Sequence, residues 1–406
     1  MADSSIRRVT LLGATGTIGR ATLSVVDTAP DQFHMVGLTA HSAAAELAEL
    51  ARQYRPQLVA LADDSAMTRA AWHTAGAGDD FLQTLPIDFG DAAVARVAMQ
   101  PTDRLVVGIV GIDALPAVWQ GLTSQLATGN AIFKMALANK ESVVAAGHLL
   151  LADGRHRAAI IPLDSEHNAI FQCLLGQDKA AVRHITLTAS GGPFWQRDAA
   201  SFATISVAEA LNHPRWKMGK KISIDSATLF NKALEIIEAS YLFGMGEEHI
   251  RVFIHPQSVI HSLVGFADGS QLAQLGPADM RVPIAFALGF PQRLVIDSAA
   301  RDFAALDLLA MGRFDFFAPD DGKFKSLNLA RAALRHGGAA PLVLNSSNEV
   351  LVESFLQGII PFTAIEKGVA TMLDQPIPRA GSDVASVMAL DKEIKIKTRA
   401  MVQQQY

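Results

Sequence analysis

Acidic side chains that could hold a metal ion occur at two places in the chain. Asp164 and Glu166 follow residues 158–163, an apolar run that predicts a strand, and Glu235 lies in a predicted helix. If the strand continues through Glu166, these two side chains point the same way, because strand side chains repeat with period two. Paired carboxylates repel each other unless a cation or a proton lies between them. The alternative is that one of them caps, or lies on the surface of, a helix beginning near Asn168.

The helix that carries Glu235 is predicted to run from Leu229. Its apolar residues form one stripe, and its polar residues lie on the opposite face, at spacings of three and four: Asn231, Lys232, Glu235 and Glu238. Residues 222–224 predict a strand that leads into hydroxyl residues. Ser226, Asn231 and Lys232 would then converge on an anion, with Glu235 facing a cation. A solvated ion-pair face is the alternative. Oxygen-only ligands favour Mg²⁺ or Mn²⁺ over zinc.

A glycine-rich segment, 13–19, follows a predicted strand over 9–12 and opens a predicted helix over 18–28. Glycines there let the backbone approach a pyrophosphate, and the helix N-terminus meets its charge. The spacing G-x-x-G-x-x-G is a variant often associated with phosphorylated dinucleotides. We therefore predict a dinucleotide site, with a tight structural turn as the alternative.

Three further polar segments could contribute to a binding site. Ser190 lies in the glycine-rich turn 189–193, which could form a phosphate nest or an ordinary turn. Residues 213–219 predict a lid that excludes water, with Trp216 covering the ligands, or else a tryptophan anchoring a loop to the core. Residues 137–142 place Lys140 at a helix start that Asn139 or Ser142 could cap.

The elements that must position these residues predict an α/β protein. Strands and helices alternate over 8–147, which indicates an N-terminal doubly wound, Rossmann-like parallel sheet. Strands over 185–188, 251–254 and 258–266 indicate a central α/β catalytic domain. Apolar residues at helical spacing from 327 to 402 indicate a C-terminal helical domain. The predicted boundaries are 1–154, 155–295, a linker over 296–320, and 321–406.

Composition restricts the functional class. Half of the 406 residues are hydrophobic and 18% are charged, which argues against extensive disorder. The apolar run 282–290 is too short to span a bilayer, no secretory signal is visible, and a single cysteine, Cys173, fits a reducing compartment. The net charge is −5 and the sequence has no basic cluster, so it does not indicate a surface that binds nucleic acid. We expect a soluble, cytoplasmic protein that binds neither membrane nor nucleic acid.

Together these segments resemble the 1-deoxy-D-xylulose 5-phosphate reductoisomerase family. The matching segments occur in family order: 13–19, 137–142, 162–172, 189–193, 212–239, 255–261 and 345–350. The resemblance implies an NADPH-dependent homodimer of three-domain subunits. It also implies conversion of 1-deoxy-D-xylulose 5-phosphate to 2-C-methyl-D-erythritol 4-phosphate in non-mevalonate isoprenoid synthesis.

The resemblance also implies roles for individual residues. The implied metal ligands, for Mg²⁺ or Mn²⁺, are Asp164, Glu166 and Glu235. The implied phosphate-binding residues are Ser190, Ser226, Asn231 and Lys232. Other implied substrate contacts are Lys140, Ser165, Glu166, His213, Trp216 and Glu235. The implied cofactor contacts are Thr15, Gly16, Thr17, Ile18, Asn139, Glu141 and Gly219, with Trp216 and Met218 in a flap. The catalytic group would be Lys140, Asp164, Glu166, His213 and Glu235.

One segment departs from the family pattern. After the second strand the family usually has a basic residue that receives the adenosine 2′-phosphate, whereas residues 40–43 here contain neither lysine nor arginine. We predict that His41, if protonated, and the Ser42 hydroxyl take this role.

Two other functions remain as alternatives. The first is a semialdehyde dehydrogenase, which needs a reactive thiol, although Cys173 lies in an apolar helical run. The second is a cofactor-sensing regulator without catalysis, which would not need the three carboxylates.

Overall fold

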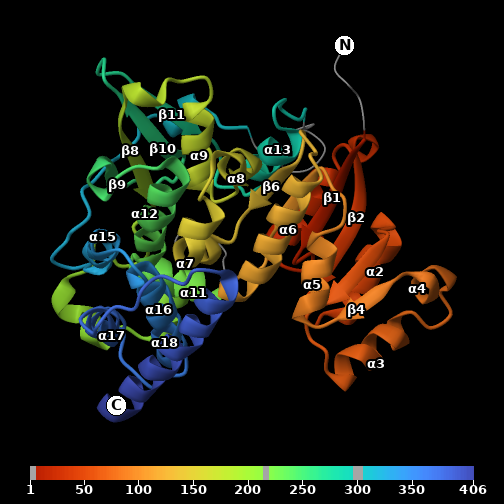
Figure 1. The fold of residues 1–406 in the computed structure, drawn as a ribbon. Coiled ribbons are helices and arrows are strands. Elements are labelled where there is room, and N and C mark those ends of the chain that lie inside the picture. Colours follow the sequence, from red (N-terminus) through yellow and green to blue (C-terminus); the bar gives the residue numbers. More distant parts are fainter. Residues whose placement is uncertain (1–5, 214–218, 296–304) are drawn as a thin grey trace. The chain divides into compact units, whose positions relative to one another are not determined.

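The computed structural model describes residues 6–213, 219–295 and 305–406 (Figure 1). The chain forms two compact units. Unit 1 comprises Met1–Ser142, Ala152–Ser165 and Asp279–Ala304, and unit 2 comprises Val143–Leu151, Glu166–Ala278 and Ala305–Tyr406. The four-part boundaries predicted above stay a prediction.

Unit 1 contains a seven-stranded sheet in the order β4-β3-β2-β1-β5-β6-β7, and every paired strand is parallel to its neighbour. The chain moves outward from β1 to β4 and then returns to β5 beside β1. This reversal creates a switch point at which doubly wound sheets bind ligands, beyond the carboxyl ends of the strands. The strands are β1 Arg7–Leu12, β2 Phe33–Ala40, β3 Leu58–Leu61, β4 Ile87–Phe89, β5 Arg104–Val107, β6 Lys134–Leu137 and β7 Ile160–Pro162.

The strands of this sheet are apolar because helices cover both faces. Val9, Leu11 and Leu12 of β1 are fully buried, as expected for a central parallel strand. The helices are α1 Thr17–Val26, α2 Ala44–Tyr54, α3 Ala66–Ala75, α4 Asp80–Thr84, α5 Asp91–Ala98, α6 Leu115–Ala127, α8 Gly154–Ala159 and α13 Arg281–Gly289. Helix α7, Lys140–Leu150, begins in unit 1 and continues into unit 2. The doubly wound fold predicted from the sequence is confirmed.

Helix α13 belongs to unit 1 although it is distant in sequence, and a buried arginine holds it there. Arg104, at the start of β5, is 2% exposed. Its guanidinium donates to the carbonyl oxygens of Leu288 (3.1 Å) and Phe290 at the end of α13, and to that of Ile132 (2.6 Å). These bonds satisfy carbonyls that a helix C-terminus leaves without partners. Burial lowers the pKa of Arg104 to about 10, so the side chain stays charged at neutral pH.

Unit 2 contains a four-stranded sheet in the order β11-β10-β8-β9. Strand β10 is antiparallel to β8 and β11, and β8 is parallel to β9. The strands are β8 Val182–Ala189, β9 Ile250–Ile254, β10 Ile260–Phe266 and β11 Gln271–Leu275. The helices are α9 Ser165–Leu174, α10 Val207–Leu211, α11 Lys220–Ala227, α12 Phe230–Phe243, α14 Leu308–Met311, α15 Ser326–His336, α16 Ala340–Leu356, α17 Thr363–Leu373 and α18 Val384–Gln405. Short 3₁₀ turns occupy Pro30–Gln32, Ile112–Ala114, Lys179–Ala181, Ala199–Thr204 and Glu247–His249.

One apolar core joins the sheet of unit 2 to its helices. Phe230, Ile236 and Ile237 of α12 are fully buried in it, together with Ile185 of β8 and Leu344 of α16. The helical C-terminal region predicted from residue 327 onward is thus confirmed, and its helices share a core with the sheet.

Two local predictions are wrong. Residues 222–224, predicted as a strand, lie in α11, where Ile224 is fully buried in the core; tertiary packing has overridden β propensity. The extended run before Glu166 does not persist, because α9 already begins at Ser165. The period-two argument for Asp164 and Glu166 therefore fails, although the helix start itself lies close to the predicted alternative.

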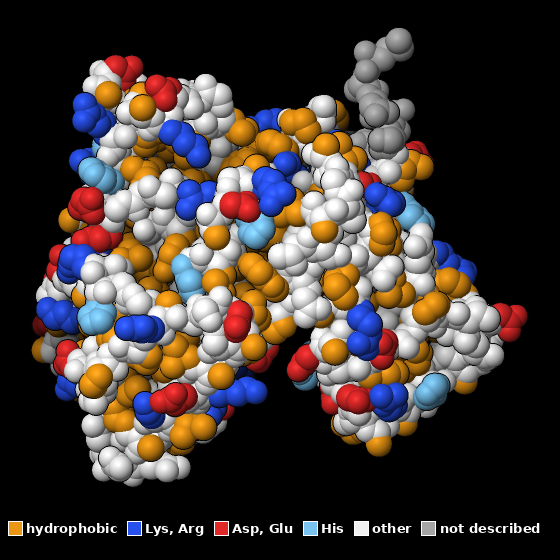
Figure 2. Space-filling view, in the orientation of Figure 1, with side chains coloured by type: hydrophobic (Ala, Val, Ile, Leu, Met, Phe, Trp, Pro, Cys, Tyr) orange, Lys and Arg blue, Asp and Glu red, His pale blue; other side chains and the backbone are white. Residues whose placement is uncertain are grey.

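Charged side chains of both signs are interspersed on the face drawn in Figure 2. Across the part of the chain that the structure describes, no helix is long and apolar enough to cross a membrane.

We predict that Arg104→Met destabilises unit 1. The substitution removes the side-chain donor to the Phe290 and Ile132 carbonyls and one of the two donors to the Leu288 carbonyl, which Arg7 also binds, and losing such a network costs roughly 3 kcal/mol or more. Thermal unfolding should begin at least about 5 °C lower than in the wild type. Arg96→Met is the matched control, because Arg96 is exposed and pairs with the exposed Asp88. Equal melting curves for both variants would contradict the anchoring role.

Candidate active site

The glycine loop between β1 and α1 is built for close approach to a ligand. Gly13 has φ +83°, and its N–H donates to Thr39 Oγ1 at 3.0 Å. A Cβ on Gly19 would lie 2.3 Å from the Gly13 carbonyl oxygen, so only glycine fits. Gly16 caps α1 without a side-chain hydrogen bond, and Gly16 and Thr17 are exposed. The loop therefore presents backbone N–H groups to an anion at a helix N-terminus, which fits a dinucleotide pyrophosphate.

The other predicted cofactor residues of unit 1 also lie at the carboxyl edge of its sheet. His41 and Ser42 follow β2 and are exposed. Asn139 follows β6 and is buried; its amide donates to the carbonyls of Ile109 (3.0 Å) and Gly111 (2.8 Å). The Asn139 oxygen accepts from the Ser142 N–H at 2.9 Å. Asn139 therefore caps α7, the alternative considered from sequence, and also fixes the loop after β5.

Unit 1 carries one buried ion pair at this edge. Lys140, at the start of α7, contacts Asp164, which precedes α9. Their side chains are 9% and 10% exposed. Glu141 is also buried, and one of its oxygens accepts from the Asn139 amide at 3.3 Å. Ser165 begins α9 and is half-buried.

Unit 2 buries an ammonium between two carboxylates. Lys232 Nζ lies 2.7 Å from Glu166 Oε1 and 2.5 Å from Glu235 Oε2. Lys232 is 3% exposed and Glu235 is fully buried. Asn231 donates to the other oxygen of Glu235 at 2.7 Å. The polar face of α12 is therefore not a solvated ion-pair surface, and that alternative is wrong.

The two carboxylates also fit a metal ion. A carboxylate oxygen of Glu166 and one of Glu235 lie within 4.8 Å of each other. Oxygen atoms at this spacing can bind one hard cation. A second acid on α12, Glu238, faces His167 Nδ1 at 3.4 Å, while His167 Nε2 contacts the Glu235 backbone carbonyl at 3.0 Å.

A second polar group in unit 2 collects around Ser190. Its hydroxyl lies 3.0 Å from His213 Nε2 and accepts from the Gly192 N–H at 3.3 Å. Gly192 has φ +66°, and a Cβ there would lie 2.5 Å from the Ser226 carbonyl oxygen. The turn after β8 thus packs directly against α11. Burial lowers the pKa of His213 to about 4, so the imidazole is neutral at physiological pH.

Residues missed from sequence hold Ser226 in place. Its neighbour Asp225 is 2% exposed and accepts from Lys221 Nζ and from the Asn348 amide, both at 2.7 Å. Lys221 and Asp225 are four residues apart, which is a recognisable helix pair, but sequence spacing gave no sign of Asn348 on α16.

The predicted site residues thus fall into local groups. Within unit 2 the structure brings Glu166 and Asn231 together with Lys232 and Glu235, and brings Ser190 together with His213. Gly219 is exposed at the N-terminus of α11. Trp216 and Met218 lie outside the described residues.

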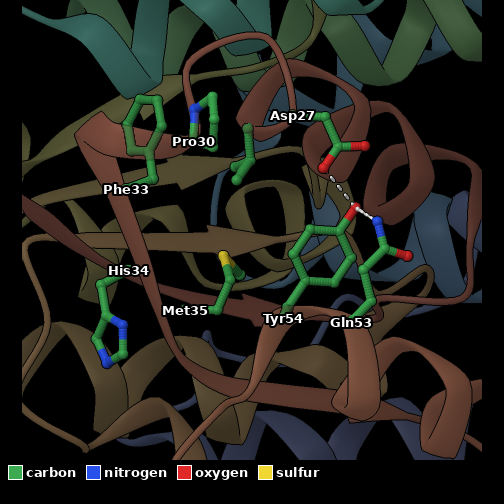
Figure 3. Close-up of a pocket in the computed structure, with 8 residues that line it drawn as sticks. Asp27, Pro30, Phe33, His34, Met35, Gln53 and Tyr54 are labelled. Carbon is green, nitrogen blue, oxygen red and sulfur yellow. Dashed lines mark hydrogen bonds between the residues drawn. The ribbon is translucent and has the colours of Figure 1, made fainter.

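A separate cavity of about 230 Å³ lies near the opposite edge of unit 1 (Figure 3). It is lined by the ends of α1 and α2 and the start of β2, and the Tyr54 hydroxyl donates to Asp27 at 2.9 Å. Because the glycine loop follows the carboxyl end of β1, this cavity is not the dinucleotide site.

Fold and site together define a class: an α/β oxidoreductase with a dinucleotide-binding sheet and a second unit that buries carboxylates, a lysine and hydroxyl groups. Known proteins narrow this class. Sequence profiles match over 9–147 for 1-deoxy-D-xylulose 5-phosphate reductoisomerase, and over 160–243 and 275–397 for C-terminal domains of that enzyme. The chain belongs to the 1-deoxy-D-xylulose 5-phosphate reductoisomerase family, which confirms the resemblance.

Full-length relatives support this assignment. The reductoisomerase of Cupriavidus metallidurans is 43% identical over 98% of both chains, and that of Symbiobacterium thermophilum is 45% identical over 95% of this chain and 96% of its own. The solved structure of the Zymomonas mobilis enzyme with NADPH has a TM-score of 0.88 at 38% identity, covering 98% of this chain and 99% of that one. A reductoisomerase solved with NADPH, fosmidomycin and magnesium has a TM-score of 0.87 at 36% identity, covering 98% of each chain.

We predict that Glu235→Gln keeps the fold but weakens Mn²⁺ binding and lowers kcat at least about a hundredfold, because a bound cation contributes several kcal/mol to catalysis. Glu238→Gln is the matched control, since Glu238 is an equally buried acid one turn further along α12. Titration with Mn²⁺ and steady-state kinetics check both variants. If only Glu238→Gln lost metal affinity, the ion would belong to the Glu238–His167 pair.

Proposed function

We propose that the protein converts 1-deoxy-D-xylulose 5-phosphate to 2-C-methyl-D-erythritol 4-phosphate with NADPH and Mg²⁺ or Mn²⁺, as a step of non-mevalonate isoprenoid synthesis. The observation that carries the proposal is the buried Glu166–Lys232–Glu235 group beside Asn231 on α12. A family match over nearly the whole chain supports it.

We propose Asp164, Glu166 and Glu235 as the metal ligands. Asp164 lies two residues before Glu166, so chain connectivity keeps its carboxylate within reach of Glu166. A bound divalent cation supplies Lewis-acid polarisation of the substrate's oxygen atoms. Lys140, whose ammonium pairs with Asp164, would hold this carboxylate and provide a proton donor near the substrate.

Phosphate binding is assigned to Ser190, Ser226, Asn231 and Lys232. Hydroxyl, amide and ammonium groups are all donors to phosphate oxygens. Once the two glutamates are neutralised by a bound cation, Lys232 would be available to the phosphate. His213, which is neutral, would add an uncharged ring nitrogen beside Ser190. Binding of the phosphate would in turn position the reacting end of the substrate.

NADPH supplies the hydride for the reductive step. Thr15, Gly16, Thr17 and Ile18 would bind its pyrophosphate at the N-terminus of α1, and Asn139 and Glu141 would line the same edge of the sheet. His41 and Ser42 after β2, Ser165 at the start of α9 and Gly219 at the start of α11 complete the proposed contacts.

The two alternative functions fit less well. Burial raises the pKa of the Cys173 thiol to about 11, so this side chain is a poor nucleophile for a semialdehyde dehydrogenase. A non-catalytic regulator would have no use for buried charges, which are costly to desolvate.

We predict that turnover depends on a divalent cation. A chelator should abolish NADPH oxidation in the presence of 1-deoxy-D-xylulose 5-phosphate, and added Mg²⁺ or Mn²⁺ should restore it. Binding of NADPH alone should survive the chelator, because the glycine loop holds the cofactor with backbone groups. Full turnover in chelator would overturn the metal-dependent function.

We also propose a cytoplasmic homodimer. Strand β11 is an edge strand of its sheet, with Leu272 42% exposed, and such edges readily pair with a second chain. Light scattering during size exclusion should give twice the chain mass, and Leu272→Lys should lower that mass. A wild-type mass equal to one chain would contradict the proposal.

A further inference from the structure

The cofactor site of this chain needs a positive charge that the turn after β2 does not contain. NADPH differs from NADH by a phosphate on the adenosine ribose, which binds beside the end of the second strand in doubly wound folds. Residues 40–43 offer His41 and Ser42 but no lysine or arginine. A doubly charged phosphate is normally met by a guanidinium or ammonium group.

An arginine from another element contacts the first turn of α2, the helix that follows this turn. Arg20 lies in α1, directly after the last glycine of the loop, and its Nε donates to the Thr15 carbonyl at 3.2 Å. Its Nη2 lies 2.5 Å from Glu46 Oε1, in the first turn of α2. Because α2 follows the β2 turn, the guanidinium spans from the pyrophosphate loop to the helix that begins after His41 and Ser42.

The charges around His41 favour Arg20 as the phosphate partner. Asp63 donates its backbone N–H to the His41 carbonyl at 2.9 Å. Hydrogen bonds from Thr68 and Ser65, together with the nearby His41 ring, hold the pKa of the Asp63 carboxyl below its usual value. An ionised carboxylate therefore lies near His41 and reduces the positive potential that this histidine could offer to a phosphate.

The Arg20–Glu46 pair has little structural role to explain it. The Arg20 side chain is 64% exposed and that of Glu46 is 30% exposed. An exposed ion pair of this kind contributes little to stability. A phosphate with nearly two negative charges attracts the guanidinium more strongly than one carboxylate does.

We infer that Arg20 determines the preference for NADPH: its guanidinium binds the adenosine 2′-phosphate, and Glu46 holds the side chain in place when no cofactor is bound. The inference rests on NADPH being the cofactor. The positive charge that distinguishes NADPH from NADH would then come from α1 and not from the turn after β2. Glu46 would compete with the phosphate for this charge.

The test is direct binding of NADPH and NADH to the full chain without substrate, followed by the fluorescence of the bound nicotinamide. Losing one charge-assisted hydrogen bond should raise the Kd for NADPH about ten- to a hundredfold in Arg20→Gln, while the Kd for NADH changes less than about twofold. Arg20→Lys should recover part of the loss. Glu46→Gln should tighten NADPH, because the competing carboxylate is removed, and leave NADH unchanged.

Arg96→Gln is the matched control, since Arg96 is an exposed, ion-paired arginine of the same unit that joins α5 to β4. Equal weakening of both cofactors in Arg20→Gln would show that Arg20 only supports the glycine loop, and no weakening of NADPH would assign the phosphate to other residues. Either result would overturn the inference while turnover of 1-deoxy-D-xylulose 5-phosphate continues. If the wild type neither bound NADPH nor turned over that substrate, the proposed function itself would fail.

Discussion

The buried ammonium of Lys232 is the interaction on which the site in unit 2 depends. Two carboxylates cannot stay ionised inside a protein without a nearby positive charge, because desolvation and mutual repulsion both favour protonation. Lys232 provides that charge from the same helix as Glu235, one turn away, while Glu166 comes from α9. Replacing such a group with apolar residues would often cost nothing in stability. The burial of these charged groups is therefore best explained by chemistry.

Several contacts outside the site keep this helix in place. Leu229, with φ +58°, forms a sharp junction between α11 and α12. The Thr228 carbonyl next to it accepts from the Ser326 hydroxyl on α15 at 2.9 Å, and Asp225 accepts from Asn348 on α16. The C-terminal helices thus bond to the backbone and side chains that flank Ser226 and Asn231. Their role is to fix α11 and α12, which carry proposed phosphate ligands, although they supply none of the proposed ligands themselves.

Sequence reasoning succeeded where pattern and chemistry are local. Strand β1, predicted over 9–12, and the glycine loop follow directly from an apolar run and glycine spacing, and the polar stripe of α12 is visible in its periodicity. It failed at 222–224, where packing from elsewhere in the chain buries Ile224 within a helix, and at Glu166, where α9 starts earlier than expected. Segment 345–350 was matched to the family, but the contact of Asn348 with Asp225, like that of Arg104 with Leu288, could not be predicted because the partners are distant in sequence. Periodicity says which face of an element is buried, but not which polar groups meet there.

The position of α13 has a consequence for synthesis of the protein on the ribosome. Unit 1 is built from three separate stretches of chain, and the carbonyl that Arg104 binds at Leu288 is made 184 residues after Arg104 itself. The parallel sheet can assemble early, but its buried guanidinium has no partner at the end of α13 until about half of unit 2 has been translated. The interior of unit 1, although most of its chain is made first, is therefore completed late. A nascent chain stopped before α13 would expose the surface that this helix covers and an arginine left only with partners such as the Asp103 and Ile132 carbonyls.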